Sequence, residues 1–155
     1  MQFENLKAVL EFAIEKEIEA AEFYESIARE ESAAGSKKMF LEFSAEEQKH
    51  RALLENIDKK GVAQGLADYK FKWITDIKRS DYVVEMEYEK NMAYNDILMI
   101  AMKREEKALK LYNALLENAD DPEQKKVFKV LCQEEAKHKL ALETLYDDYM
   151  AEMGD

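Results

Sequence analysis

Cysteine, proline and glycine are scarce in this sequence of 155 residues, which contains one cysteine, one proline and four glycines. Because Cys132 is alone, no internal disulfide can form, and no Cys-x-x-Cys motif is present for a cysteine-ligated metal site. So few glycines and prolines cannot supply the many turns of a β-sandwich, whereas long helices with short connections need few of them. The scarcity predicts an all-α protein.

Basic residues and long apolar runs are also few. The chain has 23 Lys and Arg against 34 Asp and Glu, a formal net charge of −11, which argues against nucleic-acid binding and against an anionic membrane surface. No apolar run is long enough to cross a bilayer, and the beginning, MQFENLKAVLEFAIEKE, does not read as a secretory signal. We therefore expect a cytoplasmic protein with no membrane or nucleic-acid partner, and its length favours a single domain over residues 1–155.

The chain contains an internal repeat. Residues 11–55 align without a gap with residues 99–143, at a constant offset of 88. The matched positions are Ala13 and Ala101, Glu17 and Glu105, Ala20 and Ala108, Tyr24 and Tyr112, Phe40 and Phe128, Glu47 and Glu135, His50 and His138, and Leu54 and Leu142. Two related halves flank a middle segment, which indicates a duplicated helical hairpin rather than a solenoid.

Apolar residues recur at intervals of three and four in each half, which predicts two amphipathic helices per half. The break at residues 33–36 makes Ser36 a candidate N-cap of the second helix, Asn95 is the candidate cap of the third, and Asp121 before Pro122 is a strong start for the fourth. The expected helices cover about 4–31, 36–59, 95–118 and 122–151.

The middle segment, about 60–94, is too long for a simple loop and too aromatic for a flexible linker. It begins with GVAQG and carries five aromatic residues, Tyr69, Phe71, Trp73, Tyr82 and Tyr88. We expect a crossover with some helix of its own, packed along the bundle. Because short turns join the helices of each half, the sequence predicts a ferritin-like four-helix bundle of two antiparallel pairs joined by this long crossover.

Six polar residues occupy positions of the apolar stripes that should face the core. They are Glu17, Glu47, His50, Glu105, Glu135 and His138. An uncompensated buried carboxylate costs several kcal/mol, and four of them near one another would repel and take up protons. A cation at the centre of such a group removes both costs.

The spacing of the six residues points to two metal ions. Glu-x-x-His places both side chains on one helix face, and one glutamate from each of two helices plus Glu-x-x-His from the other two is the donor set of dinuclear carboxylate sites in helical bundles. Carboxylate and imidazole ligands suit iron or manganese, and open coordination positions would accept O2, peroxide or water. The alternative is a structural bundle that keeps a buried polar network and binds no metal.

Two tyrosines, the cysteine and four further glutamates also lie in these segments. Tyr24 and Tyr112 lie two turns after Glu17 and Glu105, where they hydrogen-bond to the carboxylates, relay an electron, or serve as ordinary core tyrosines. Cys132 is expected to be a buried structural thiol. The remaining glutamates of these segments are expected on the solvated face: Glu15, Glu19, Glu46 and Glu134.

The two halves resemble the rubrerythrin branch of the ferritin-like superfamily, through AIEKEIEAAEFY followed by EEQKH and through AMKREEKALKLY followed by EEAKH. The resemblance implies a four-helix bundle with a di-iron centre, often in a homodimer, and peroxide reduction or ferrous oxidation as the activity. By motif, its iron ligands would be the six polar residues above.

Two features differ from typical rubrerythrins. The chain shows no C-terminal rubredoxin domain, and Ala108, like Ala20, stands where the family has an additional glutamate, so the ligand set resembles the symmetric ferroxidase centre of bacterioferritin. We expect a di-iron oxidoreductase that reacts with hydrogen peroxide or O2 and takes electrons from an external donor such as a separate rubredoxin. The alternatives are an iron-binding or storage protein with a ferroxidase loading step, and a manganese catalase-like site.

Overall fold

The computed structural model describes residues 3–30, 34–71, 87–89 and 92–153. Within these ranges all regular secondary structure is helical, which confirms the all-α prediction. The helices are α1 (Leu6–Glu30), α2 (Ala34–Lys60), α3 (Val62–Gly65), α4 (Tyr94–Asn118) and α5 (Pro122–Met153). The four long helices agree with the expected ranges to within two residues at each end.

The chain divides into two compact units. Unit 1 comprises Met1–Lys70 with Asp121–Lys126, and unit 2 comprises Phe71–Asp120 with Val127–Asp155. Unit 1 therefore contains α1, α2 and α3, and unit 2 contains α4 and most of α5. The single-domain assignment from the sequence stays a prediction.

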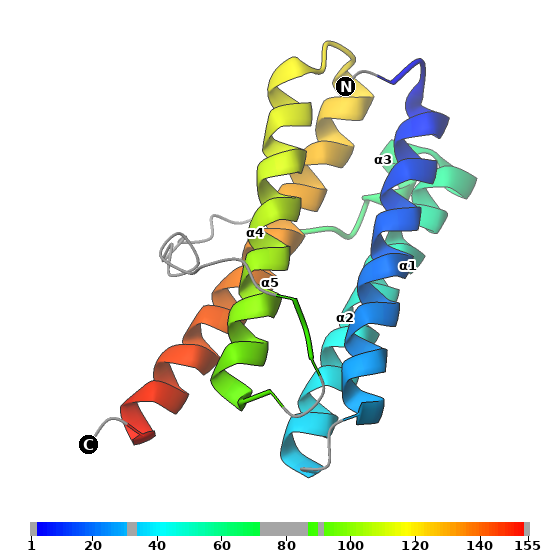
Figure 1. Cartoon of the computed structure of the whole chain (residues 1–155). Helices are drawn as coiled ribbons and strands as arrows, with labels where there is room; N and C mark the ends of the chain where they lie inside the picture. Colours follow the sequence, from blue (N-terminus) through cyan, green and yellow to red (C-terminus); the bar gives the residue numbers. More distant parts are fainter. Residues whose placement is uncertain (1–2, 31–33, 72–86, 90–91, 154–155) are drawn as a thin grey trace. The chain divides into compact units, whose positions relative to one another are not determined.

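In unit 1, α1 and α2 form an antiparallel hairpin (Figure 1). The hydroxyl of Ser44 donates a hydrogen bond to the carbonyl of Ala21 at 2.9 Å, and this bond ties the two helices near their middle. Tyr24 on α1 packs its ring against Phe40 and Phe43 of α2, with centroids 6.3 and 5.6 Å away. These buried residues belong to the apolar stripes read from the sequence, so periodicity placed the core of this hairpin correctly.

The short helix α3 folds back onto the end of α2. Gly61 makes the turn at φ 87°, a conformation that favours glycine, and its amide donates to the carbonyl of Ile57 at 2.8 Å. Val62 and Leu66 are buried by this turn, at 3% and 6% exposure. Gly65 lies so close to α2 that a Cβ atom there would stand 2.7 Å from the Cα of Ile57.

Gly65→Ala is therefore expected to destabilise the protein by about 1–3 kcal/mol, because backbone at that distance cannot yield as a flexible side chain can. Urea unfolding of the variant measures the loss. Gln64→Ala is the matched control, since Gln64 lies on the same helix and is exposed. A Gly65→Ala protein with the unfolding free energy of the wild type would contradict this account of the α2–α3 contact.

In unit 2, α4 and α5 form a second antiparallel hairpin (Figure 1). Tyr94 packs edge-on against Tyr149, with ring centroids 4.9 Å apart. Further along, the Cys132 thiol donates to Oδ1 of Asn113 at 3.4 Å. Between these contacts, His138 lies beside Glu105 as His50 lies beside Glu17 in unit 1, so the two hairpins have the same register at the offset of the repeat.

Two of the three expected N-caps are wrong. α2 begins at Ala34, ahead of Ser36, because Ala is a strong helix former and the helix continues through Gly35 at a cost of about 1 kcal/mol. α4 begins at Tyr94, and its N-cap is Ala93 without a side-chain cap bond. Packing of Tyr94 against Tyr149 favours the earlier start over a cap by Asn95.

Asp121 does cap α5. Its Oδ2 accepts a hydrogen bond from the amide of Gln124 at 2.9 Å, and Pro122 is the first helical residue, which confirms the predicted start. Asn5 is an N-cap that the sequence analysis did not predict. Its Oδ1 accepts a hydrogen bond from the amide of Ala8 at 2.9 Å, at the start of α1.

Asp121→Ala is expected to lower the unfolding free energy by about 1 kcal/mol, since the amide of Gln124 then loses its acceptor. Thermal or urea unfolding measures this loss. Asp121→Asn, which retains a capping oxygen, and Asp120→Ala, which alters an exposed neighbour, should both stay close to wild type. Equal losses in Asp121→Ala and Asp121→Asn would show that the cap bond is not the cause.

The crossover expected at 60–94 is described in part. Its predicted helical content is confirmed by α3, while Trp73, Tyr82 and the packing of the segment along the bundle fall outside the described residues. Of its other aromatic residues, Tyr69 and Tyr88 are half-buried and Phe71 is 48% exposed.

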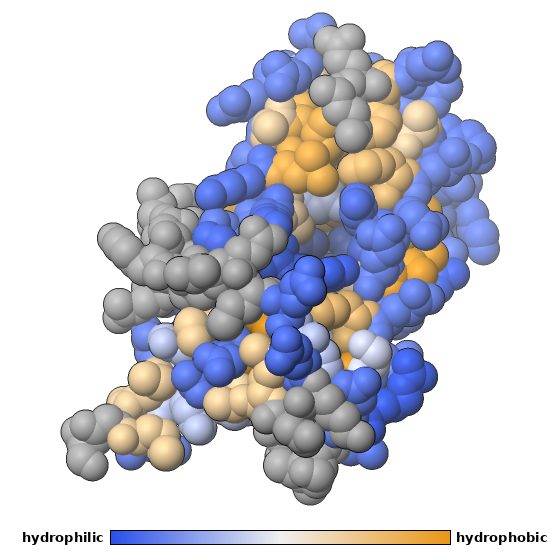
Figure 2. All heavy atoms as spheres, viewed as in Figure 1, coloured by the Kyte–Doolittle hydropathy of each residue, from blue (hydrophilic) through white to orange (hydrophobic). Residues whose placement is uncertain are grey.

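Hydrophilic residues form most of the coloured surface in Figure 2, with smaller apolar areas between them. This agrees with a chain of which 37% is charged. No helix in the described ranges has the length and hydropathy needed to span a bilayer.

Candidate metal centre

All six polar residues predicted at core positions are buried in the structure. Each has an exposed fraction of 6% or less: Glu17, Glu47, His50, Glu105, Glu135 and His138. Unit 1 contributes the first triad, which is Glu17 on α1 with Glu47 and His50 on α2. Unit 2 contributes the second triad, which is Glu105 on α4 with Glu135 and His138 on α5.

The first triad is tightly grouped. Nδ1 of His50 lies 3.4 Å from Oε2 of Glu17 and 3.5 Å from Oε2 of Glu47. One potential ligand atom from each of the three residues lies within 4.8 Å of the others. The helix spacing of Glu47 and His50 puts both on one face of α2, and the antiparallel register brings Glu17 of α1 to the same height.

Burial and mutual contact shift the proton affinities of this triad. Burial raises the pKa of Glu17 to about 8, with a further increase from the Glu47 carboxyl and an opposing effect of His50. Burial lowers the pKa of His50, but the carboxyls of Glu17 and Glu47 outweigh this effect and raise it to about 10. At neutral pH the metal-free triad therefore keeps protons on both Glu17 and His50.

The second triad repeats the arrangement in unit 2. Nδ1 of His138 lies 3.7 Å from Oε1 of Glu105, across the antiparallel helices α4 and α5. Glu135, at 4% exposure, lies one turn before His138 on α5, as Glu47 does before His50 on α2. The imidazole nitrogen nearest the helix backbone thus faces a buried carboxylate in both units.

The donor atoms of the first triad fit a metal ion. Both carboxylate oxygens of Glu17 are buried and accept no hydrogen bond from the described residues. Buried carboxylates that lack donors are costly unless a cation or a proton neutralises them. Carboxylate oxygen together with neutral imidazole is a donor set suited to iron and manganese. Glu17, Glu47 and His50 are therefore able to hold a divalent cation.

The two tyrosines lie as core residues do, and the cysteine does not. Tyr24 and Tyr112 are fully buried, and Tyr24 belongs to an aromatic cluster with Phe40 and Phe43. Their role in hydrogen bonding to the carboxylates or in electron relay stays a prediction. Cys132 is partly exposed rather than buried. Burial of part of its thiol still raises its pKa to about 11, which keeps it protonated and unreactive.

Unit 2 contains further buried charged residues, which the sequence analysis did not predict. Glu106 accepts hydrogen bonds from Lys103 at 3.1 Å and Lys110 at 2.9 Å, and is itself only 3% exposed. Lys139 and Glu143 form a buried ion pair at 3.4 Å. The corresponding pair of the first half, Arg51 and Glu55 at 3.6 Å, is much more exposed, at 37% and 49%. The two halves therefore match in their triads and differ outside them.

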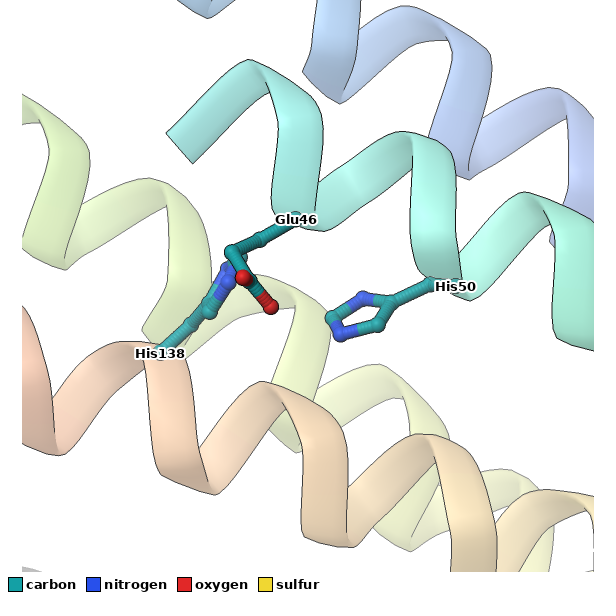
Figure 3. A group of neighbouring side chains, drawn as sticks. All are labelled: Glu46, His50 and His138. Carbon is teal, nitrogen blue, oxygen red and sulfur yellow. The ribbon is translucent and has the colours of Figure 1, made fainter. Parts of the chain in front are cut away.

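The first glutamates of the two EEQKH-type motifs, Glu46 and Glu134, were both expected on the solvated face, and Glu134 differs from that expectation. The Glu46 side chain is 46% exposed, but that of Glu134 is only 13% exposed, so Glu134 does not lie on a solvated face. Each is paired with the lysine three residues later, Glu46 with Lys49 and Glu134 with Lys137, both at 3.0 Å. Glu46 and His50 extend from α2 one turn apart and point toward each other, and His138 extends from α5 (Figure 3).

Comparison with known proteins agrees with this reading. The rubrerythrin family model matches residues 8–146, which is most of the chain. A solved structure of a hypothetical protein from Pyrococcus furiosus is 26% identical, with a TM-score of 0.57 and coverage of 93% of this chain and 89% of that one. No curated protein matches the sequence significantly.

Rubrerythrins typically carry iron in a di-iron carboxylate centre within an all-α ferritin-like bundle, and this chain has the helices and the clustered acidic and histidine side chains that such a centre needs. The family match spans both halves of the repeat and therefore both triads. The chain belongs to the rubrerythrin family.

Proposed function

We propose that this protein is a di-iron oxidoreductase that reduces hydrogen peroxide or oxidises ferrous iron with O2, using an external electron donor such as a separate rubredoxin. The two triads are its six ligands: Glu17, Glu47, His50, Glu105, Glu135 and His138. We further propose that the protein acts in the cytoplasm as a homodimer. One observation carries the proposal. Each hairpin buries two glutamates and one histidine at matching positions of the repeat, and in each the histidine lies beside the glutamate of the other helix.

The side chains have distinct tasks in this proposal. The two histidines offer Nδ1, which already faces a carboxylate in each unit, and each would complete the coordination of one metal ion. The four glutamates would supply four negative charges, which balance two divalent cations, and carboxylate oxygens suit iron and manganese. A pair of ferrous ions held there would supply the two electrons that, with two protons, reduce peroxide to water.

Buried apolar residues flank the ligands along their helices. Leu54, Leu98 and Ala101 are buried at 1% exposure or less, on the same helices as the ligands. A dry surrounding strengthens the attraction between carboxylates and cations, and it limits side reactions of the reduced metal. Glu17 and the Nδ1 atom of His50 must each give up a proton when the metal enters, because a coordinating carboxylate is ionised and a coordinating imidazole is neutral.

Metal content tests the first part of the proposal. Protein purified without added metal is analysed for Fe, Mn and Zn, and then titrated anaerobically with ferrous ion. We expect saturation at two metal ions per chain, and loss of that binding in Glu47→Gln and in Glu135→Gln. Glu19→Gln, an exposed glutamate on α1, is the matched control and should bind as the wild type does. A wild-type protein that takes up no metal would overturn the proposal.

Reaction rates test the second part. The diferrous protein is mixed separately with peroxide and with air, and the appearance of ferric absorbance is followed. Faster oxidation by peroxide supports a peroxide reductase, and faster oxidation by O2 with continued uptake of iron beyond two ions per chain supports a ferroxidase that loads a store. Retention of manganese with rapid release of O2 from peroxide would instead identify a catalase-like site.

A further inference from the structure

Glu46 lies close to His50, one of the two triad histidines. It lies four residues before His50 on α2, a spacing that puts both side chains on one face of the helix. A carboxylate oxygen of Glu46 and a ring nitrogen of His50 lie within 4.8 Å of each other. The two side chains point toward one another (Figure 3).

The two nitrogens of the His50 ring have different surroundings. Nδ1 faces Glu17 and Glu47, at 3.4 and 3.5 Å, so Nδ1 is the nitrogen that belongs to the triad. An imidazole that binds a metal through Nδ1 carries its proton on Nε2. Metal-binding histidines almost always donate this second N–H to a carboxylate, a carbonyl or water, and the donation fixes both the tautomer and the ring orientation.

We propose that Glu46 is a positioning residue, whose carboxylate accepts a hydrogen bond from Nε2–H of His50 and thereby holds Nδ1 ready for the metal. This inference rests on the proposed function, because His50 has to be a ligand for its orientation to matter. The Glu46 side chain is 46% exposed, whereas the triad residues are buried.

The neighbouring lysine supports this role. Lys49 donates a hydrogen bond to Oε1 of Glu46 at 3.0 Å, and this bond restricts the orientation of the Glu46 carboxylate. The second half of the chain repeats the pair as Glu134 with Lys137 at 3.0 Å, again four residues and one residue before a histidine.

A matched pair elsewhere provides the control. Lys16 and Glu19 on α1 lie 3.6 Å apart at the same spacing of three residues, and the Glu19 side chain is 50% exposed. The residue four positions after Glu19 is Phe23, so no histidine can be oriented by it. Glu19→Ala therefore reproduces the loss of an exposed glutamate and its lysine pair without the proposed contact.

The test uses nuclear magnetic resonance of protein labelled with ¹⁵N only in histidine, where two rings give a simple spectrum. His138→Gln assigns the signals. In Glu46→Ala, the Nε2–H signal of His50 is expected to move upfield and to exchange faster with water, in the metal-free and the zinc-loaded protein alike. Glu46→Gln, whose amide oxygen still accepts, should restore part of the shift, and Glu19→Ala should change nothing.

Zinc titration adds the consequence for the metal. Loss of a hydrogen-bond partner to a ligand histidine lowers metal affinity by about 10–100-fold, and we expect a decrease of this size in Glu46→Ala and none in Glu19→Ala. If the His50 Nε2–H signal and the zinc affinity of Glu46→Ala match the wild type, the inference is overturned and the proposed function stands. If the wild type binds no zinc or ferrous ion, the proposed function fails first, and the role of Glu46 as a positioning residue fails with it.

Discussion

Glu47→Gln is expected to abolish the stabilisation of this protein by divalent metal. A ligand that binds only the folded state stabilises it by about 4 kcal/mol when its concentration is a thousand times its Kd. Glu47 is fully buried, and its Oε2 lies 3.5 Å from Nδ1 of His50, so its carboxylate cannot be replaced by solvent or by a surface residue. Glutamine keeps the shape of the side chain but removes the charge that balances the cation.

The measurement is urea unfolding of the wild type and the variant, each with a chelator and with excess ferrous ion under anaerobic conditions. The metal-free forms should differ by about 1 kcal/mol or less, because the substitution is close to isosteric. The metal-dependent increase should disappear in Glu47→Gln and in its counterpart Glu135→Gln, and persist in Glu19→Gln. Full metal-dependent stabilisation of Glu47→Gln would remove Glu47 from the ligand set.

Without metal, the protein is expected to become less stable as the pH rises from 6 to 9. The pKa of Glu17 is 4.5 in the reference state and about 8 in the folded protein, and that of His50 is 6.5 and about 10. In both cases the folded state binds protons more tightly than the unfolded chain. The stability that these protons confer is complete below the unfolded pKa and is lost as the pH rises through the folded pKa.

Each group destabilises the protein over the pH range between its unfolded and folded pKa. These ranges overlap between pH 6.5 and 8, so the unfolding free energy falls most steeply there, by roughly a few kcal/mol in total by pH 9. Metal should reverse the sign, because a cation competes with these protons and binds more tightly as they leave. The increase in unfolding free energy on adding metal should therefore grow with pH over the range in which the metal-free protein weakens.

Urea unfolding at half-unit pH steps, with chelator and with metal, measures both trends. Glu17→Gln is the informative variant, since glutamine resembles the protonated carboxyl and cannot lose a proton. Its metal-free stability should vary less with pH than that of the wild type, whereas Glu19→Gln should follow the wild type and account for general charge repulsion. A flat or rising metal-free profile between pH 6 and 9 would contradict the protonation of this triad.

The sequence predicted the helices well because each carries a strong and regular apolar stripe. It predicted the six polar core residues for the same reason, since a glutamate such as Glu17 is conspicuous between Ala13 and Tyr24 on a buried face. Caps were less predictable. The start of α4 depends on the contact of Tyr94 with Tyr149, which is distant in sequence and leaves no local signal.

The buried charges outside the triads were missed for a related reason. Glu106, Lys139 and Glu143 lie in segments rich in Glu and Lys, and such segments usually face solvent. Their burial depends on what packs against α4 and α5, and the pattern of a single helix does not contain that information. Comparison of the halves would have given one hint that Glu106 is buried, because the equivalent residue of the first half is the apolar Ile18.

The shared register of the two hairpins bears on the ancestry of the chain. Equivalent contacts at a constant offset are what tandem duplication of a gene for one hairpin leaves behind. Once both copies lie in one polypeptide, a substitution in one is no longer imposed on the other, as it is in a symmetric homodimer of single hairpins. The triads have stayed alike, while the buried Lys139–Glu143 pair and the exposed Arg51–Glu55 pair record divergence that only the fused chain permits.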